Sequence, residues 1–249
     1  MTTTAEKLTG SVHSFDVSTG VDGPGTRFVA FLAGCPLRCQ YCHSPDTWYR
    51  GNGRPMTVDE LIAEIHRYER FIKVAGGGVT LSGGEPLQQP AFTREVLTRC
   101  KELGLHTALD TSGFLGAAAD DELLGATDLV LLDIKSGDRD TYRRVTRSGR
   151  LAPTVHFAHR LAKRNMPIWV RFVLVPGLTD AMANVAAVAD IVAAVPTVQR
   201  VEVLPFHRLG AAKYAALGLR FPLADTEPPG PELLNRVRGQ FRTRGLTVY

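Results

Sequence analysis

Residues 27–42 of the chain read RFVAFLAGCPLRCQYC, and this stretch decides the fold prediction. Its first part, Arg27 to Ala33, is a short apolar run rich in residues that favour strands, and it ends at Gly34. The chain then passes directly into three cysteines, Cys35, Cys39 and Cys42. The pattern predicts a strand followed by a loop that carries all three thiols.

The spacing of these cysteines indicates an iron–sulfur site. Iron–sulfur clusters are held by cysteine thiolates, and a cubane cluster bound by three thiolates keeps one iron without a protein ligand. The amino and carboxylate groups of a bound cofactor can chelate that open iron. The fourth cysteine, Cys100, stands alone in a segment with a helical pattern, residues 91–103, so we predict an ordinary buried thiol there.

Two other interpretations of the cysteines stay open at this stage. One is a zinc site made by the three cysteines and His43, and the other is a chance cluster of structural thiols. Zinc sites usually contain paired Cys-x-x-Cys units. The spacing of three and then two residues, with Tyr41 immediately before the last cysteine, favours the iron–sulfur interpretation.

Beyond the cysteines, the chain alternates between strand and helix patterns. Thr57 to Glu60, TVDE, has the form of a capping box and predicts a helix through about Lys73. Six β-then-α units favour a parallel sheet with helices outside it, so we predict an α/β fold, a partial (β/α)6 TIM-like barrel, with residues 1–249 in one domain. The later strand candidates are Gly78–Ser82, His106–Asp110, Asp128–Ile134, Ile168–Val175 and Val198–Pro205.

Composition and charge exclude several classes of protein. Of the 249 residues, 44% are apolar and 22% charged, which is typical of globular chains. The formal charge of +4 is mildly basic, and because Lys and Arg are interleaved with acids we expect no nucleic-acid partner. No apolar stretch is long enough to span a membrane, and Met1 to Gly10 lacks the apolar core of a secretory signal. We therefore expect a cytoplasmic protein with metal or redox chemistry at its clustered cysteines.

Polar residues follow the predicted strands at their carboxyl ends. In parallel α/β folds, functional groups gather at that edge of the sheet, so we expect one site there. The residues are Cys35 after the first strand, Gly83, Gly84 and Glu85 after the second, Asp110 and Thr111 at the third, Asp133 and Lys135 at the fourth, Arg171 within the fifth and His207 after the sixth.

Several short motifs together carry a family resemblance. They are Asp22–Arg27 (DGPGTR), the cysteine motif with Tyr41–His43 (YCH), Gly76–Pro86 (GGGVTLSGGEP), Leu109–Gly113 (LDTSG), Leu132–Lys135 (LDIK) and Leu204–His207 (LPFH). The pattern Cys-x-x-x-Cys-x-Tyr-Cys is similar to the signature of the radical S-adenosylmethionine (SAM) superfamily. Nearly from end to end, the chain resembles its glycyl-radical-activating branch, above all the family of pyruvate formate-lyase activating enzymes.

The resemblance implies the ligands of the predicted site. A [4Fe-4S] cluster would be bound by Cys35, Cys39 and Cys42, and SAM would chelate its open iron. In the family, the GGE stretch holds the SAM amino group, a role that carries over to Gly84 and Glu85. The other implied SAM contacts are Tyr41, Cys42, His43, Asp133, Ile134, Lys135, Arg171 and His207; a monovalent cation would lie near Asp110, Thr111 and Asp133, and a substrate peptide near Asp22 and Arg27.

Some of these residues also have purely structural interpretations. The aspartates can cap strand-to-helix turns, and His207 can be an internally satisfied histidine. Arg171 can pair with an aspartate at a neighbouring strand end.

The resemblance also implies a reaction and partners. A flavodoxin or ferredoxin would deliver one electron, SAM would yield a 5′-deoxyadenosyl radical, and that radical would take hydrogen from a glycine of pyruvate formate-lyase. We expect the chain to act as a monomer without a membrane partner. The alternatives are an activase of another glycyl-radical enzyme, a small-molecule radical SAM enzyme and a non-catalytic zinc or redox module.

Overall fold

The sheet at the centre of the fold has eight strands in the order β3-β1-β2-β4-β5-β6-β7-β8. The computed structural model describes residues 7–147 and 149–249. The neighbouring strands from β2 through β4 to β8 are parallel, whereas β1 is antiparallel to both β2 and β3. The strands are β1 (Thr9–Thr19), β2 (Thr26–Leu32), β3 (Arg54–Thr57), β4 (Gly78–Gly83), β5 (His106–Thr111), β6 (Leu129–Asp133), β7 (Ile168–Leu174) and β8 (Val198–Pro205).

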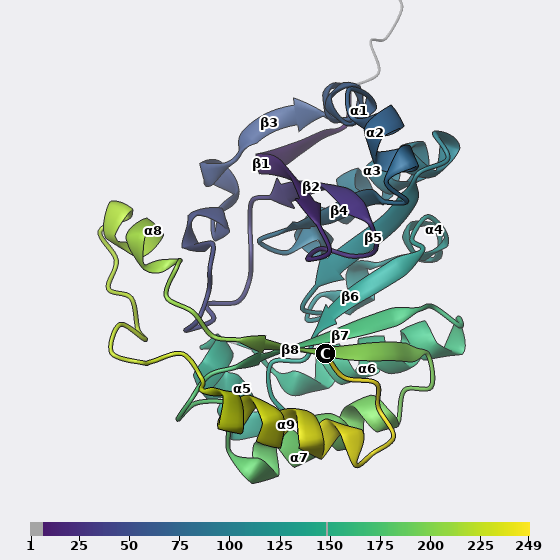
Figure 1. Cartoon of the computed structure of the whole chain (residues 1–249). Helices are drawn as coiled ribbons and strands as arrows, with labels where there is room; N and C mark the ends of the chain where they lie inside the picture. Colours follow the sequence, from purple (N-terminus) through teal and green to yellow (C-terminus); the bar gives the residue numbers. More distant parts are fainter. Residues whose placement is uncertain (1–6, 148) are drawn as a thin grey trace, which may run out of the picture.

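The six parallel strands confirm the predicted alternation, and each lies within one residue of its predicted bounds at either end. Strands β4 and β6 are almost continuously buried, as expected where helices cover one face of a parallel sheet and the barrel interior the other. The sheet curls without joining β3 to β8, so it is an open, partial barrel, as predicted (Figure 1).

The antiparallel strands β1 and β3 were not predicted from the sequence. Along β1, only Gly10 and Val12 are fully buried, and Ser, His, Asp and Thr residues fill most of the remaining positions. The strand is nevertheless held by long pairing with β2, from Val12 to Thr19. Its alternation was too weak to read because β1 lies near the margin of the sheet, where one face stays partly open to solvent.

The helices pack mainly on the outer face of the sheet (Figure 1). One prediction about them was wrong, because the helix expected from Thr57 to about Lys73 is two helices. Its capping box is confirmed, since Thr57 Oγ1 accepts from Glu60 N and the Glu60 carboxylate accepts from Thr57 N. The break at Arg67 and Tyr68 turns the second helix so that Ile72 is buried and the Tyr68 ring lies 5.7 Å from that of Phe28.

The helices are α1 (Val58–His66), α2 (Glu69–Val74), α3 (Pro90–Glu102), α4 (Asp121–Gly125), α5 (Arg139–Thr146), α6 (Leu151–Lys163), α7 (Met182–Ala193), α8 (Ala211–Ala216) and α9 (Pro231–Arg242). Short 3₁₀ helices are η1 (Pro45–Thr47), η2 (Arg50–Asn52), η3 (Pro86–Gln88) and η4 (Gly116–Ala118). Within residues 7–147 and 149–249, no helix combines the length and apolarity needed to cross a membrane. Residues 1–6, part of the segment inspected for a secretory signal, lie outside the described residues.

Two apolar clusters position the site. The large one lies between the sheet and its helices and contains the buried Cys100, as predicted. A smaller one, which we call the upper cluster, lies at the carboxyl ends of the strands and joins α5, the segment after β7 and residues 206–223. Its members are Val145, Val175, Leu178, Phe206, Tyr214, Phe221 and Leu223. Residues 206–227, which include α8 and which we call the cover, therefore have their own apolar anchor.

Candidate functional site

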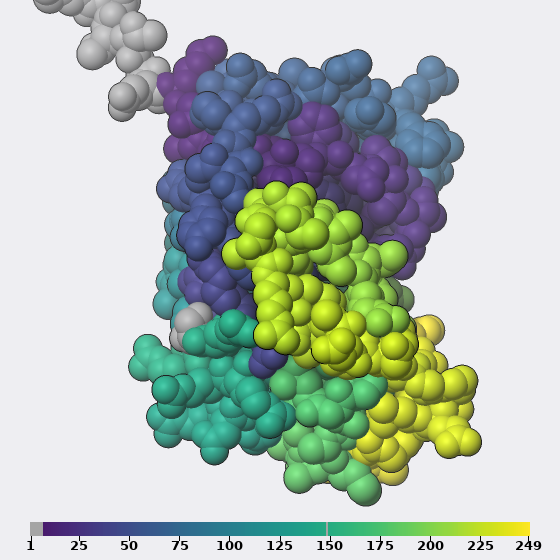
Figure 2. Space-filling view, turned by 90° about the vertical axis from the view of Figure 1, so that its left-hand side faces the viewer, coloured from purple at the N-terminus to yellow at the C-terminus, as the bar shows by residue number. Residues whose placement is uncertain are grey.

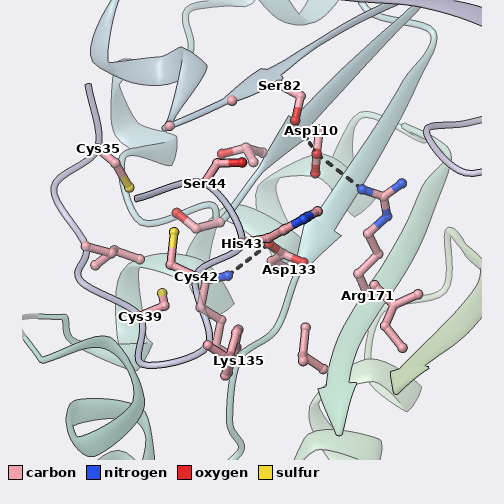
Figure 3. A pocket seen from close by; sticks show the side chains of 18 of the residues that line it. Cys35, Cys39, Cys42, His43, Ser44, Ser82, Asp110, Asp133, Lys135 and Arg171 are labelled. Atoms are coloured by element: carbon pink, nitrogen blue, oxygen red, sulfur yellow. Dashed lines mark hydrogen bonds and ion pairs between the residues drawn. The ribbon is translucent and has the colours of Figure 1, made fainter. Parts of the chain in front are cut away.

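A cavity of about 470 Å³ lies at the carboxyl ends of the parallel strands. Figure 3 shows the three cysteines on one side of it and Arg171 on the other. The cavity gathers thirteen of the predicted site residues, namely Asp22, Cys35, Cys39, Tyr41, Cys42, His43, Gly84, Asp110, Thr111, Asp133, Lys135, Arg171 and His207. The strands bring these residues together because their carboxyl ends share one edge of the sheet.

The cysteine loop, residues 34–44, is held from two sides by its backbone. On one side, Gly34 N donates to Thr47 O at 2.7 Å and Cys35 N to Trp48 O at 3.0 Å. On the other side, the backbone N–H groups of residues 38 and 40 donate to the carbonyls of residues 146 and 145, both at 2.9 Å. Gly34 has a φ of +105°, a conformation that favours glycine at the point where the chain leaves β2. The loop therefore presents its thiols from a fixed frame.

The three thiols are free and lie in a low-dielectric environment. Burial raises the pKa of Cys35, and it raises the pKa of Cys39 to about 11 against the opposing effect of Lys135. Burial likewise raises the pKa of Cys42. Thiolates at these positions therefore need a cation, and metal binding removes thiol protons. In the described ranges, no three His, Cys, Asp or Glu side chains are arranged to hold a single metal ion.

The turn after β4 brings backbone next to the cysteine loop. A Cβ atom at Gly84 would overlap the carbonyl oxygen of Gly34 and come within 2.9 Å of Thr47 O, so only glycine fits without movement. Gly83, with a φ of +112°, meets the backbone of Leu32 in the same way. Backbone groups of this turn thus line the cavity directly.

Glu85 does not line the cavity. Its side chain is buried and accepts hydrogen bonds from Thr111 Oγ1 at 2.7 Å and from Ser112 N at 3.0 Å. Burial raises the pKa of this carboxyl group against the effect of its hydrogen bonds. Glu85 therefore links the end of β4 to the end of β5. The Thr111 hydroxyl donates its proton to Glu85 and is not free to donate to a ligand.

Arg171 forms the centre of an ion-pair network on the far wall. Its guanidinium lies 3.2 Å from Asp110 and 3.3 Å from Glu202, and it also donates to the carbonyl oxygen of Val21. Ser82 Oγ donates to Asp110 at 2.6 Å. Burial raises the pKa of Asp110 to about 6, although Arg171 opposes the shift. The pairing of Arg171 with a strand-end aspartate, one of the alternatives raised from the sequence, is therefore present.

Asp133 and Lys135 form a second ion pair, 2.9 Å long, on the floor of the cavity. Burial lowers the pKa of Lys135, but the nearby Asp133 and Cys39 outweigh this effect and the pKa ends well above its ordinary value. The Lys135 ammonium lies 5.7 Å from the ring centre of Tyr41, whose buried hydroxyl has no hydrogen-bond partner among the described residues. A hydrogen-bonding group of a ligand could pair with the Tyr41 hydroxyl at this part of the cavity.

Two predicted residues point elsewhere. The Ile134 side chain is buried in the large core, so only its backbone lies close to the site. Arg27 is fully buried at the opposite end of the strands, where it donates to Thr80 Oγ1 at 2.8 Å and to the backbone carbonyl of Val79. The expected contact of Arg27 with a substrate peptide therefore has no support in the geometry, and we drop it.

The cover completes the site above the cysteine loop. The rings of His43 and His207 meet edge to face at 5.0 Å, and Tyr214 meets Trp48 in the same manner at 5.6 Å. Lys213 Nζ lies 3.2 Å from the Asp46 carboxylate. In Figure 2, the yellow-green cover extends across the blue and purple surface of the N-terminal half.

Sequence reasoning missed the apolar lining of the cavity. These residues are Phe31, Leu37, Trp48, Val173, Leu204, Pro205 and Phe206. Part of the set was accessible, because side chains two apart on a strand share a face and Val173 therefore lies on the same face as Arg171. The contribution of Trp48 depended on a loop contact that no pattern predicts.

The fold and the cysteine loop define the class of protein, and comparisons with known proteins agree. The radical SAM superfamily matches residues 29–188. Among curated proteins, the chain is 44% identical over 218 residues to the pyruvate formate-lyase-activating enzyme of Clostridium pasteurianum, covering 88% of this chain and 91% of the relative. It is 40% identical over 241 residues to the pyruvate formate-lyase 1-activating enzyme of Escherichia coli K12, covering 96% and 98%.

Solved structures show the same fold. A domain of the pyruvate-formate lyase-activating enzyme from Bacteroides vulgatus matches with a TM-score of 0.58 and 25% identity, covering 70% of this chain and 98% of that one. A radical SAM methyltransferase from Sphaerobacter thermophilus matches with a TM-score of 0.63 and 17% identity, covering 94% of this chain and 71% of that one.

The chain belongs to the radical SAM superfamily and, within it, to the family of pyruvate formate-lyase-activating enzymes. It is therefore an enzyme that works with a [4Fe-4S] cluster and SAM.

Proposed function

We propose that this enzyme activates pyruvate formate-lyase by generating a radical on one of its glycines. The observation that carries the proposal is the meeting of three free thiols and a close-packed glycine turn in one cavity, in a chain 40% identical to such an activating enzyme over 96% of its length. When bound, the cluster and SAM supply one-electron cleavage of a carbon–sulfur bond and the radical that removes hydrogen from a glycine α-carbon.

The donor set fits the two cofactors. We assign Cys35, Cys39 and Cys42 to three irons of the cluster, because thiolates are its usual ligands and the cavity holds all three. Carbonyl groups of the turn at Gly84 suit the SAM amino group, since they are acceptors at the wall beside the cysteine loop.

Charged and aromatic side chains suit the rest of SAM. Lys135, kept protonated by Asp133, offers a donor for the carboxylate, and the buried hydroxyl of Tyr41 lacks a partner in the described chain. His43 and His207 stand where the cover meets the loop and complete the assigned contacts. Arg171 is largely satisfied by Asp110 and Glu202, so we assign it to the wall of the site and not to a direct SAM bond.

The remaining predicted roles follow from position. A monovalent cation suits the Asp110 and Asp133 carboxylates, whereas the Thr111 hydroxyl is already used by Glu85. Asp22 lies at the cavity, 3.8 Å from Arg171, where an entering glycine segment would pass. The chain thus binds and orients its ligands and excludes water; no side chain is required as a general base.

The finer partner and cellular assignments also belong to this proposal. We expect a flavodoxin or ferredoxin as the electron donor, a monomeric enzyme whose residues 1–249 act as one radical SAM domain, and a reducing cytoplasm in which free thiols persist. The single continuous sheet, with the assigned residues on its strands or in the loops between them, supports the single-domain assignment.

The test is the formation of a glycyl radical. Anaerobic, reconstituted and reduced enzyme should give a glycyl electron paramagnetic resonance signal when it is mixed with SAM and pyruvate formate-lyase. A pyruvate formate-lyase variant with alanine at the acceptor glycine is the matched control and should remain silent. Failure with pyruvate formate-lyase and success with another glycyl-radical enzyme would overturn the partner while keeping the chemistry.

A further inference from the structure

The positive charge of the chain is concentrated in one short segment. Residues 139–150, RDTYRRVTRSGR, contain five arginines and one aspartate. The whole chain has 29 Lys and Arg and 25 Asp and Glu, so its other residues carry 24 basic and 24 acidic side chains and are formally neutral. Basic and acidic residues are therefore interleaved over the rest of the chain but not in this segment, which holds the entire formal excess of +4.

The structure turns this segment into a surface stripe. Arg139 and Arg143 are four residues apart on α5, so they share one helix face. Arg147 follows directly after the last residue of α5, in a left-handed conformation with a φ of +60°. All three are exposed, and none forms an ion pair with any described residue. Tyr142, Val145 and Thr146 of the same helix are buried. We call Arg139, Arg143 and Arg147 the arginine stripe.

The helix that carries the stripe is bonded to the cysteine loop. Arg38 N donates to Thr146 O, and Gln40 N to Val145 O, both at 2.9 Å. The side chain of Gln40 also donates to Arg144 O at 2.7 Å. Cys39 lies between these two loop residues, so the last turn of α5, which carries Arg143, is bonded directly beside a predicted cluster ligand. Figure 2 shows the teal region that includes α5 on the same face of the molecule as the cover.

We propose that the arginine stripe is the docking surface for an acidic one-electron carrier protein that reduces the cluster. This inference rests on the proposed function, because it assumes a cluster at the cysteine loop. One electron leaves the reduced carrier, which is oxidised, and enters the cluster, which is reduced; no bond forms or breaks. Unpaired arginines attract an acidic partner over a long range and orient it during encounter.

Position favours an electron carrier over the substrate protein as the occupant. A substrate protein has to insert a glycine into the cavity, where Arg171 lies on the wall away from the cysteines and Asp22 lies 3.8 Å from Arg171. An electron carrier only has to approach the cluster from outside the loop. The stripe lies on that outer side, because α5 contacts the loop through the backbone of residues 38 and 40.

The test compares cluster reduction by two donors in matched variants. The stripe variant is Arg139→Gln/Arg143→Gln/Arg147→Gln. The control variant is Arg67→Gln/Arg70→Gln/Lys73→Gln, in the break after α1 and on α2, which removes the same charge elsewhere. The donors are a photoreduced acidic flavodoxin and a photoreduced deazaflavin, which is too small to need a docking surface. The reconstituted full-length enzyme is used, and stopped-flow absorbance reports the rate.

We expect the second-order rate with flavodoxin to fall at least tenfold in the stripe variant at low salt, and its salt dependence to flatten. The control variant should keep the wild-type rate, and reduction by deazaflavin should be equal in all three proteins. Equal flavodoxin rates in both variants would overturn the inference, and so would a parallel loss with deazaflavin. So would salt-sensitive DNA binding that the stripe variant loses while its flavodoxin rate stays normal.

The outcome is independent of the final activity. Cluster reduction is read without pyruvate formate-lyase, so a missing glycyl signal in the wild type would break the proposed function and leave this measurement interpretable. A normal glycyl signal together with unchanged flavodoxin rates would break only the docking assignment.

Discussion

The cysteine loop and the strand-end rim face each other across one cavity, yet different interactions hold them (Figure 3). The rim, formed by Ser82, Asp110, Asp133 and Arg171, takes its geometry from the register of parallel strands, in which Asp133 pairs directly with Arg171. The loop contains no regular element between Gly34 and Ser44. It is held by backbone hydrogen bonds to residues 145 and 146 of α5 and to residues 47 and 48 near its own end.

This difference shows how one site can depend on two kinds of order. The hydrogen bonds between several parallel strands form cooperatively. A single side-chain change at the strand ends is tolerated, because the backbone hydrogen bonds along the rest of the strands remain. A loop fixed by a few long-range bonds and by the upper cluster can open locally while the sheet stays folded. We therefore expect changes at the loop to affect the cofactor first, and changes at the rim to affect pH dependence and stability.

The largest effect should follow Cys39→Ala. Loss of one of three thiolates leaves too few ligands for the cluster, so we expect loss of iron and sulfide and at least a thousandfold loss of glycyl-radical formation. Iron and sulfide analysis of oxygen-free protein measures it. Cys100→Ala is the control, because this thiol is buried in the large core away from the cavity and should leave the cluster content unchanged. Full activity of Cys39→Ala would refute the site.

An intermediate effect is expected at the cover. Lys213 pairs with Asp46 at 3.2 Å and is partly exposed, and such a pair contributes up to about 1 kcal/mol, which is about a fivefold change in a local opening equilibrium. Lys213→Met should therefore speed the bleaching of the cluster in air by up to about fivefold, measured by absorbance. Arg244→Met, which breaks the distant pair with Asp190, should have no effect. Equal bleaching in both variants would mean that the cover does not protect the loop.

The smallest effect concerns the rim. The pKa of Asp110 is raised by burial to about 6, above its value in the unfolded chain, so the folded protein holds a proton that the unfolded chain has released. This contribution to stability is present at low pH and is lost as pH rises through about 6. Between pH 5 and 7, the wild type should lose about 1 kcal/mol relative to Asp110→Asn.

Anaerobic urea unfolding at several pH values measures this difference in the free energy of unfolding. The exposed Asp225→Asn serves as the control and should parallel the wild type. If the free energy of unfolding of Asp110→Asn changed with pH in parallel with that of the wild type, the Asp110 carboxyl group would not titrate in this range. The expected pH dependence of the rim would then be refuted.

Much of the fold and site was predictable from local patterns. The six parallel strands were read correctly because their buried residues run almost without interruption, as in β4 and β6. The polar residues at their ends were then placed at one edge by topology alone. Strand β1 escaped because its alternation is diluted by polar residues, and the break between α1 and α2 escaped because nothing in residues 57–73 stops a helix.

The sequence by itself determined the chemistry: three thiols at a set spacing after a strand, and acids and bases at later strand ends, because ligand type and strand periodicity are local properties. Only the tertiary structure decided how those groups are used. It turned Glu85 and Arg27 inward as structural anchors and joined Arg171 to Asp110. It also set α5 and its arginines against the cysteine loop. These outcomes depend on which distant segments meet, and such contacts arise from packing that no single stretch of the chain encodes.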